Sequence, residues 1–570
     1  MPGIYISNFN NKNNLNNVYP SKCVFEEIPI SGYKVYRNTL AKFMDDKVFA
    51  QDNDFVLITE GVILNRIELM RKYRQQDFFH TVKEMLKKNG EEFFKEFRGS
   101  FCGAVYNKAL DEWIVYTNQV GDKSVFYYFE NGKFVIGTQV NYILNTLKKN
   151  GCPLTFDRKA MYDMLTFAFM EQDSTYAHEI KRLGAGQYIK ISKGQLHIYK
   201  YFEFLRDDGH LRDLQEEELI DIIDSKFRQA IQREYEKDLE YGYRIYTDLS
   251  GGLDSRMTMW VGAEMGYLPM THLTYCQANY KDELIAKDLA DYWGNEIVVK
   301  SLNDARFMYD IERIVEMNNG LSLYSGITGG MRLLEMIDSE FMGLEHTGQL
   351  GDAVLGSFYK KAEQIGNWEL TGMYSEKLKD RISDEYKHTF CDNEMYLLYT
   401  RGFQGAMCTH SIRQNYTEVS SPFIDVDFLS FCYNIPAELR VKHNIYIKWI
   451  LSKYPEAAGF EWEKSGCKLS AGNAEQFIRK VITAGPRKLR KALRITDKIS
   501  NKGMNPMDYW YKSKCELSRF MDGYFEENIC NKVFDKKEKE CLESYYKNGT
   551  TMEKTQALTV LGAVNYYFGS

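Results

Sequence analysis

Long apolar runs, metal-binding cysteine patterns and an excess of basic residues are all missing from this sequence. No stretch of 18 apolar residues occurs, so neither a transmembrane helix nor membrane insertion is expected. The 11 cysteines lack CxxC or Cys/His metal spacing, and their odd count without a secretory signal indicates reduced thiols in a cytoplasmic protein. A net charge of -6 argues against a nucleic-acid partner. One basic stretch, residues 486–502, is interpreted as a solvated helix face, with a docking patch for an acidic partner as the alternative.

The chain nevertheless has enough apolar material for more than one core. Its 570 residues, 44% of them hydrophobic, predict two or three domains. Residues 1–205 hold short apolar and aromatic segments separated by turn signals, with helical stretches between them, which predicts an αββα sandwich of two sheets covered by helices. Residues 215–475 alternate strand and helix, which predicts a parallel α/β sheet. Residues 476–570 are predicted to form a helical C-terminal extension packed on that second domain.

The most informative stretch is Ser-Gly-Gly-Leu-Asp-Ser at residues 250–255, directly after an apolar segment. This order predicts a strand, a tight glycine turn and the start of a helix. The two glycines expose backbone N–H groups, and a helix start offers its positive end to an anion. Asp254 beside such a loop makes chemical sense if a cation is also bound, so we expect pyrophosphate together with Mg²⁺. The P-loop lysine is missing, which excludes that motif and leaves a purely structural turn as the alternative.

The hexapeptide resembles the pyrophosphate loop of ATP pyrophosphatases of the asparagine synthetase type, and the resemblance extends over about residues 220–470. It implies ATP and Mg²⁺ as cofactors. It implies nucleotide contacts from Leu249, Ser250, Gly251, Gly252, Asp254, Ser255, Tyr275, Thr347 and Gly348, with Asp254 and Asp352 as the Mg²⁺ ligands. The acidic pair at 282–283 is either part of this site or a helix cap.

The chemistry of these residues fits that resemblance. Two carboxylates at adjacent strand ends can hold Mg²⁺ on a triphosphate. The cation neutralises the pyrophosphate that leaves when a substrate carboxylate attacks the α-phosphorus, which gives an acyl-adenylate ready for attack by an amine. A lysine can stabilise negative charge on that intermediate. Spacing favours Lys464 for this role, with Lys468 as the rival and an exposed surface lysine as the alternative.

The general base is left open by the sequence. Gln349 stands where the family has Glu, or Tyr in β-lactam synthetases, and an amide cannot accept the proton. Glu418 is one candidate, and water is another. A substrate amine that is already neutral would need no base. The departure at Gln349 argues against plain asparagine synthesis.

The first domain resembles the glutaminase domain of class II amidotransferases, on residues 1–4, 59–66, 97–106 and 120–128. That family uses a thiol on its first mature residue, where this chain has Pro2. Its oxyanion asparagine falls on Glu60, whose charge would repel a developing oxyanion. Cys23 and Cys102 are expected in the core. The resemblance therefore implies a structural remnant without glutaminase activity.

The combined interpretation is an ATP-dependent, AMP-forming amide synthetase, similar in layout to β-lactam synthetases and lasso-peptide cyclases. Its substrates would be a small-molecule or peptide carboxylate and an amine, in the biosynthesis of a modified peptide, a specialised metabolite or an envelope glycan. Ammonia-dependent amidation is one alternative, and a catalytically silent nucleotide-binding regulator is another. A tRNA-modifying pyrophosphatase is disfavoured by the acidic balance. The oligomeric state, a homodimer included, is left open.

Overall fold

The first part of the chain folds into two stacked antiparallel sheets. A computed structural model describes residues 2–10, 23–207, 209–326, 328–368, 372–383, 385–471, 501 and 503–569. One sheet has the order β10-β8-β9-β1-β3-β2, and the other has the order β12-β11-β7-β6-β5-β4. Their bounds are β1 Gly3–Ser7, β2 Cys23–Ile30, β3 Tyr33–Leu40, β4 Phe49–Gln51, β5 Phe55–Ile63, β6 Gly99–Asn107, β7 Glu112–Thr117, β8 Phe126–Glu130, β9 Lys133–Gly137, β10 Lys181–Arg182, β11 Gln187–Ser192 and β12 Gln195–Lys200.

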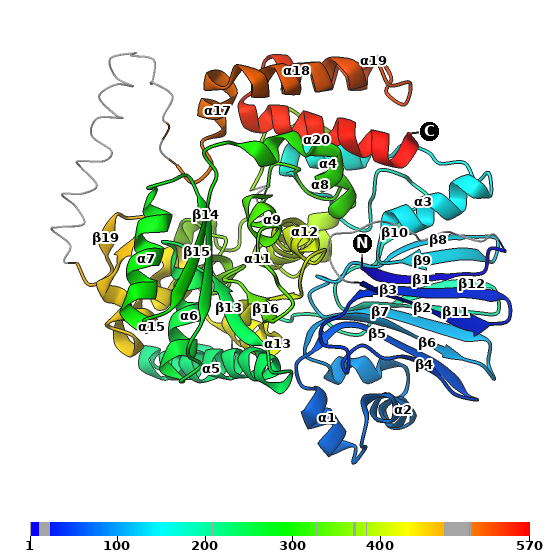
Figure 1. The fold of residues 1–570 in the computed structure, drawn as a ribbon, viewed down its shortest axis with the longest axis horizontal. Coiled ribbons are helices and arrows are strands. Elements are labelled where there is room, and N and C mark those ends of the chain that lie inside the picture. Colours follow the sequence, from blue (N-terminus) through cyan, green and yellow to red (C-terminus); the bar gives the residue numbers. More distant parts are fainter. Residues whose placement is uncertain are drawn as a thin grey trace.

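Helices cover both outer faces of this pair of sheets, as Figure 1 shows. Helices α1 (Arg66–Lys72) and α2 (Phe78–Asn89) lie on the β5-β6-β7 side. Helix α3 (Val140–Lys149) packs on β8 and β9 at the opposite face, beside α4 (Arg158–Phe167). Alternating side chains of the two sheets meet in a core that includes Ile4, Val115 and Ile136. The predicted αββα sandwich is confirmed.

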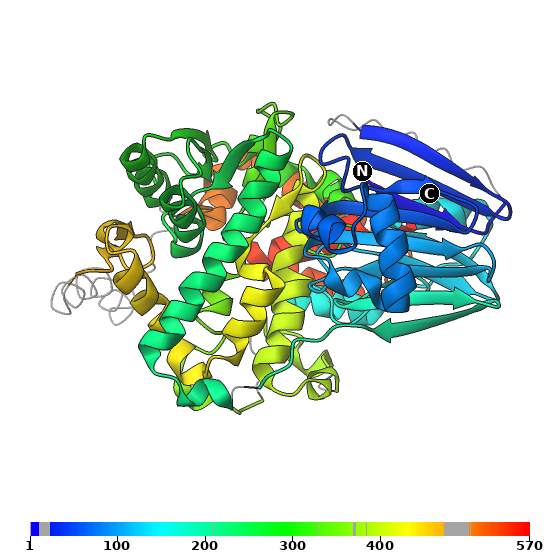
Figure 2. The same ribbon diagram turned by 90° about the horizontal axis from the view of Figure 1, so that it is seen from below.

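The second part is built on a five-stranded parallel sheet of order β15-β14-β13-β16-β17. Its strands are β13 Arg244–Asp248, β14 Thr271–Cys276, β15 Glu296–Ser301, β16 Met342–His346 and β17 Val419–Ser420. The central strand β13 leads into the 249–252 loop and then into helix α6 (Leu253–Glu264). Because ligands of parallel sheets bind at the carboxyl ends of the strands, this loop lies at the expected edge. The long helix α5 (Glu216–Glu240) runs across the base of the domain (Figure 2).

The helices that complete this part are mostly short. They are α7 Lys281–Trp293, α8 Ile311–Met317, α9 Thr328–Leu334, α10 Gly351–Val354, α11 Asn393–Leu397, α12 His410–Arg413, α13 Val426–Asn434, α14 Ala437–Arg440 and α15 Asn444–Lys453. A π-helical segment, η7 (Leu398–Gly405), continues α11.

The C-terminal helices α17 (Met507–Ser513), α18 (Cys515–Asn528), α19 (Lys536–Lys547) and α20 (Thr551–Phe568) pack together along one side of the molecule (Figure 1). The apolar C-terminal stretch is a packed helix, as expected, because α20 is buried against α4 and α8. The Gln556 amide donates a 2.8 Å hydrogen bond to the carbonyl of Leu165 in α4. Within the described ranges, no helix is long and apolar enough to cross a membrane. The basic stretch at 486–502 falls outside the described residues, apart from residue 501.

Candidate active site

The 249–252 loop is held in shape by hydrogen bonds that come from the first turns of two helices. The Ser255 hydroxyl, in the first turn of α6, accepts from the Ser250 N–H (3.1 Å) and lies 2.9 Å from the Ser250 hydroxyl. The Gly251 N–H donates to Asp282 Oδ1 at 2.8 Å, so the acid at the start of α7 fixes the loop from outside. Asp282 therefore contacts the loop directly and does more than begin its helix. The loop backbone faces a cavity of about 320 Å³.

A second loop, residues 347–350, follows β16 and presses against the start of α6. A β-carbon on Gly348 would lie 2.4 Å from the Ser255 backbone N, and one on Gly351 would lie 2.6 Å from Asp254 Cγ. Only glycine fits at these two positions, since real side chains are not found at such separations. The close approach brings the Asp352 N–H within 3.0 Å of Asp254 Oδ2. The two aspartates predicted from the sequence to share a metal are therefore neighbours at the mouth of the cavity.

The negative charges of these two carboxylates repel each other, and a bound divalent cation would relieve that repulsion. Burial and the nearby charge of Asp352 raise the pKa of Asp254 to about 8. Asp254 also accepts a 2.9 Å hydrogen bond from the Tyr446 hydroxyl, which orients the carboxylate. Oxygen ligands of this kind suit Mg²⁺, which keeps several water or phosphate ligands of its own. Among the described residues, no group of three or more His, Cys, Asp or Glu gathers around a possible metal, so Asp254 and Asp352 would be a two-ligand set.

Lys468 lines neither the 320 Å³ cavity nor a neighbouring cavity of about 890 Å³. Lys464, in contrast, lies close enough to Asp254 for its charge to act on that carboxylate. Its Nζ is 3.0 Å from His443 Nε2 and 5.5 Å from the centre of the Trp462 ring. Burial and the Lys464 charge lower the pKa of His443, so the imidazole is neutral and can accept from the ammonium. Lys442 and His443 both adopt left-handed backbone angles (φ 59° and 61°), an uncommon strain that clusters at functional sites.

The inner end of the 320 Å³ cavity is closed by a buried charge network around Arg413. This guanidinium contacts Asp248 (2.6 Å), Glu345 and the hydroxyl of Tyr275. Arg413 and Tyr275 both line the cavity, as do Leu249, Thr347 and Gly348. His410 also lines it, and its two buried ring nitrogens have no hydrogen-bond partner among the described residues. Burial and Arg413 lower the pKa of His410 to about 3, so this imidazole is neutral.

A larger cavity of about 890 Å³ meets the smaller one at Gln349, which lines both. The Gln349 side chain is fixed by donating to the carbonyl of Ala406 at 3.1 Å. Asp352, His443 and Lys464 line the larger cavity close to this junction. Two compartments therefore meet at the carboxylate pair, one beside the glycine loop and one with room for a second molecule.

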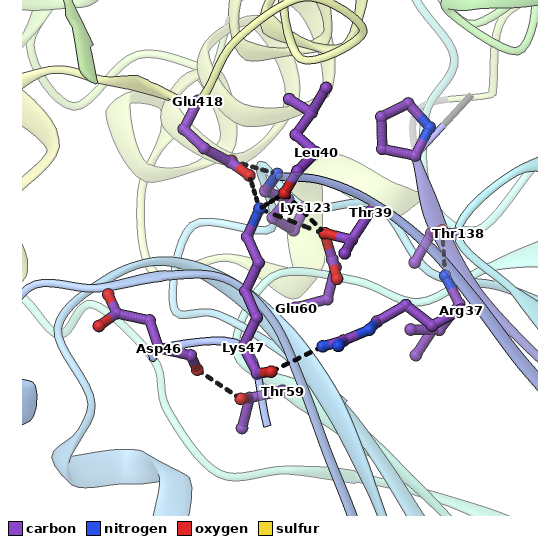
Figure 3. A network of polar contacts seen from close by, with 12 residues as sticks. Arg37, Thr39, Leu40, Asp46, Lys47, Thr59, Glu60, Lys123, Thr138 and Glu418 are labelled. Carbon is purple, nitrogen blue, oxygen red and sulfur yellow. Dashed lines mark hydrogen bonds and ion pairs between the residues drawn. The ribbon is translucent and has the colours of Figure 1, made fainter. Parts of the chain in front are cut away.

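Glu418 does not belong to this site, which corrects the interpretation of Glu418 as the base. Its carboxylate is buried, and its two oxygens each lie 2.7 Å from a lysine ammonium of the first domain, Lys47 and Lys123 (Figure 3). Burial would raise the pKa of Glu418, but these two cations outweigh it and hold the pKa at about 2. Such a carboxylate does not take up a proton near neutral pH. Glu418 instead joins the two domains.

Glu60 and Pro2, the two residues at which the sequence departs from the glutaminase motifs it resembles, lie around the same network. Glu60 accepts from the Thr39 hydroxyl (2.7 Å) and lies 3.9 Å from Lys47 Nζ. Pro2, Glu60 and Lys123 line a space of only about 30 Å³. Cys102 also lines it, but burial raises the pKa of its thiol, so it is protonated and unreactive.

Four residues of the site were not assigned a role from the sequence. They are Tyr446, His443, Arg413 and Glu463, whose backbone N–H donates to the Gly251 carbonyl at 3.1 Å. Each comes from a helix or loop distant in the sequence from both glycine loops. A single histidine or arginine without a motif carries no signal of its own, so these residues could not be identified before the fold was known.

Comparisons with known proteins match the two parts separately. Residues 44–202 match a family described as a glutamine amidotransferase domain, and residues 223–457 match a family described as asparagine synthase. A curated relative from Methanocaldococcus jannaschii, named as putative asparagine synthetase (glutamine-hydrolyzing) 2, is 22% identical over 265 residues. The match covers 44% of this chain and 50% of the relative, so the chain spans about half the length of that protein.

Two solved structures also resemble parts of the chain. A glutamine phosphoribosylpyrophosphate amidotransferase from B. subtilis has a TM-score of 0.21 and 10% identity, covering 42% of this chain and 51% of its own. An NMN synthetase from Francisella tularensis has a TM-score of 0.20 and 14% identity, covering 54% of this chain and 96% of its own.

Proposed function

Because the chain belongs to an asparagine synthetase-like family, we propose that it is an ATP-dependent ligase that adenylates a carboxylate and joins it to an amine, releasing AMP and pyrophosphate. The observation that carries the proposal is the carboxylate pair Asp254 and Asp352, which lies between two glycine loops and at the junction of two cavities. The boundaries near residues 205–215 and 475 stay a proposed division into three parts.

Each part of the site has a proposed task. The hydroxyls of Ser250 and Ser255 and the N-terminal end of α6 bind phosphate oxygens, and Leu249, Gly252, Tyr275, Thr347 and Gly348 shape the nucleotide cavity. Gly251 keeps the loop in place through its hydrogen bond to Asp282. Asp254 and Asp352 would hold Mg²⁺, which when bound neutralises the departing pyrophosphate. Lys464 lies where it can stabilise charge at the acyl group, and His443 keeps its ammonium in place. The hydrogen bond from the Gln349 amide to the Ala406 carbonyl fixes this side chain where the two cavities meet.

Lys464→Gln tests the role of the ammonium. We expect AMP formation to fall about a hundredfold, because one charge-stabilising donor is removed from the reacting group. Lys468→Gln is the matched control, since it removes the same charge four residues away and should change the rate less than about threefold. The rates would be measured as AMP released per folded enzyme. An equal loss in both variants would contradict the assignment of Lys464.

We further propose that glutamine hydrolysis is lost. Pro2 offers no nucleophile, Cys102 is unreactive, and the about 30 Å³ space between Pro2 and Glu60 is smaller than a glutamine side chain needs. Incubation with glutamine should therefore release no glutamate above the blank, with or without ATP. The amine would then be supplied directly. Glutamate release that disappears in Cys102→Ala would show that a thiol-dependent glutaminase has survived.

The proposed reaction is tested by nucleotide product analysis. Purified protein, ATP, Mg²⁺ and a small-molecule extract of the source cells are incubated, and AMP, ADP and pyrophosphate are resolved. AMP with pyrophosphate, dependent on the extract, supports adenylation and allows the extract to be fractionated to the substrate. ADP with phosphate would exclude this mechanism. Nucleotide binding without turnover in any extract fraction would instead favour a silent regulator.

A further inference from the structure

The walls of the 890 Å³ cavity combine aromatic side chains with unbalanced positive charge. Its aromatic lining is Phe167, Phe169, Phe358, Tyr359, Tyr374 and Trp462. Its charged lining is Lys360, Arg401, Lys442 and Lys464 against the single carboxylate of Asp352. If Mg²⁺ takes up the charge of Asp352, four cations face this space without an acidic counterpart in the lining. This local excess contrasts with a net charge of -6 for the whole chain.

Two acidic residues behind the cavity wall, Glu394 and Asp392, are already paired with arginines, and Glu394 lies next to the lining residue Ser357. Glu394 pairs with Arg440 and Arg206, both at 2.6 Å, and Asp392 pairs with Arg206 at 2.8 Å. Burial would raise the pKa of Glu394, but Arg440 and Arg206 hold it at about 2, so its charge is fully used within the protein. In the part of the chain that the structure describes, Lys360, Arg401 and Lys442 form no ion pair with a carboxylate.

Arg401 is held at the cavity wall by an unusual backbone. It lies on the π-helical segment η7, a rare conformation that occurs mostly at functional sites. The stem of its side chain packs against Gly372, where a β-carbon would lie 3.2 Å from Arg401 Cδ. Gly372 has a φ of +86°, so glycine suits this position for conformation as well as for space. The guanidinium is thus presented to the cavity on a fixed stem, and no described residue accepts a hydrogen bond from it.

The space is larger than one free amino acid requires. At about 890 Å³ it lies near the upper end of the roughly 300–1,000 Å³ that ligand cavities of drug-sized molecules occupy. A further hollow of about 220 Å³ adjoins it and shares Lys360, Tyr374 and Arg401 as lining. The walls also come from both domains, because Phe167 ends α4 of the first domain and Phe169 follows it. The remnant domain therefore shapes the acceptor space even without its own chemistry.

We propose that this cavity binds a peptide-sized acid that carries an aromatic or apolar body and at least one anionic group besides the carboxylate that reacts. The inference rests on the proposed function for the identity of the reacting group. The reacting carboxylate lies at the Gln349 junction, the apolar body lies against the aromatic walls, and the second anion pairs with Arg401 and Lys360. A guanidinium and an ammonium with no acceptor of their own bind carboxylate or phosphate equally well in principle.

The test is calorimetric titration without nucleotide, with three tripeptide probes that have blocked ends. They are N-acetyl-Phe-Glu-Glu-amide, the neutral N-acetyl-Phe-Gln-Gln-amide, and N-acetyl-phosphotyrosyl-Glu-Gln-amide, which keeps one carboxylate and replaces the second with a phosphate. We expect at least one acidic probe to bind at least about tenfold more tightly than the neutral probe. The tighter of the two acidic probes tells whether the second anion is a carboxylate or a phosphate.

Paired variants make the result specific to this cavity. Lys360→Gln with Arg401→Gln should reduce the preference to less than about twofold. Lys193→Gln with Arg306→Gln removes the same charges from exposed positions elsewhere and should leave the preference intact. Equal binding of acidic and neutral probes, a preference that persists in the cavity variant, or no binding of either acidic probe at millimolar concentration would overturn the proposal. Because no nucleotide is present, a failure of AMP formation would not by itself change this result.

Discussion

Asp254→Asn should abolish AMP formation, with a loss of about a thousandfold or more. Replacing groups that only orient a metal ligand costs about 10–100-fold, so the loss of one of two ligands should cost more. The same change should not destabilise the protein. Burial and Asp352 raise the pKa of Asp254 to about 8, so the folded protein disfavours its charged form, and a neutral amide removes that penalty. We therefore expect an apparent Tm at pH 8 that is equal to or higher than that of the wild type, in the absence of Mg²⁺.

Lost AMP formation together with an equal or higher Tm is specific to a carboxylate that binds a cation, because a variant that merely misfolds would lose both activity and stability. Thermal melts would be recorded with and without Mg²⁺ and ATP, because a ligand that binds only the folded state raises the Tm. The wild type should gain stability with both ligands, and the variant should gain much less. Asp288→Asn, an exposed acid on α7, is the matched control and should behave as the wild type in both assays. AMP formation within about threefold of the wild type in Asp254→Asn would remove this residue from the metal site.

Those parts of the fold that follow local rules could be predicted from the sequence. The glycines at 251 and 252 and the apolar segment before them predicted the loop, because a strand, a turn and a helix start are each encoded within a few residues. The strand–helix alternation after residue 244 predicted the parallel sheet for the same reason. Helix α7 follows local rules too, since its start is acidic and Gly294 ends it in a left-handed conformation.

What the sequence could not predict is which distant side chains meet. Glu418 looked like a possible base because its segment resembles a motif of the synthetase domain. It is instead buried against Lys47 and Lys123, which belong to the other domain and have no pattern in common with it. His443 and Tyr446 reach the carboxylates from α15 and the turn before it, and this approach depends on how that helix packs on the sheet. Such contacts are set by tertiary packing rather than by local spacing.

Glu418→Gln should destabilise the folded protein by about 3–5 kcal/mol while leaving the chemistry of the folded fraction nearly unchanged. The Glu418 carboxylate balances two buried ammonium groups, and removing one partner of a buried pair leaves uncompensated charge. Chemical unfolding followed by tryptophan fluorescence would measure the loss. Glu438→Gln, at an exposed position on α14, is the control and should change the stability by less than about 0.5 kcal/mol.

A double variant separates lost charge balance from lost packing. Adding Lys123→Met to Glu418→Gln removes the ammonium that the first change leaves unpaired, so part of the stability should return. No recovery would mean that packing rather than charge accounts for the loss. The AMP assay on Glu418→Gln also decides whether Glu418 is a structural residue or a general base, since removal of a general base would lower the rate by far more than threefold.

The pH dependence gives a third, independent check on the same carboxylate. The folded-state pKa of Glu418 is about 2, below the ordinary value of 4.5, because Lys123 and Lys47 outweigh the effect of burial. The unfolded chain therefore binds this proton more readily, and the contribution of Glu418 to stability is complete above about pH 4.5 and is lost as the pH falls towards 2. The difference in stability between the wild type and Glu418→Gln should stay constant from pH 8 to about 5 and shrink below that. A difference that shrinks between pH 8 and 6 instead would place the titrating group elsewhere, because the Glu418 carboxylate is ionised throughout that range.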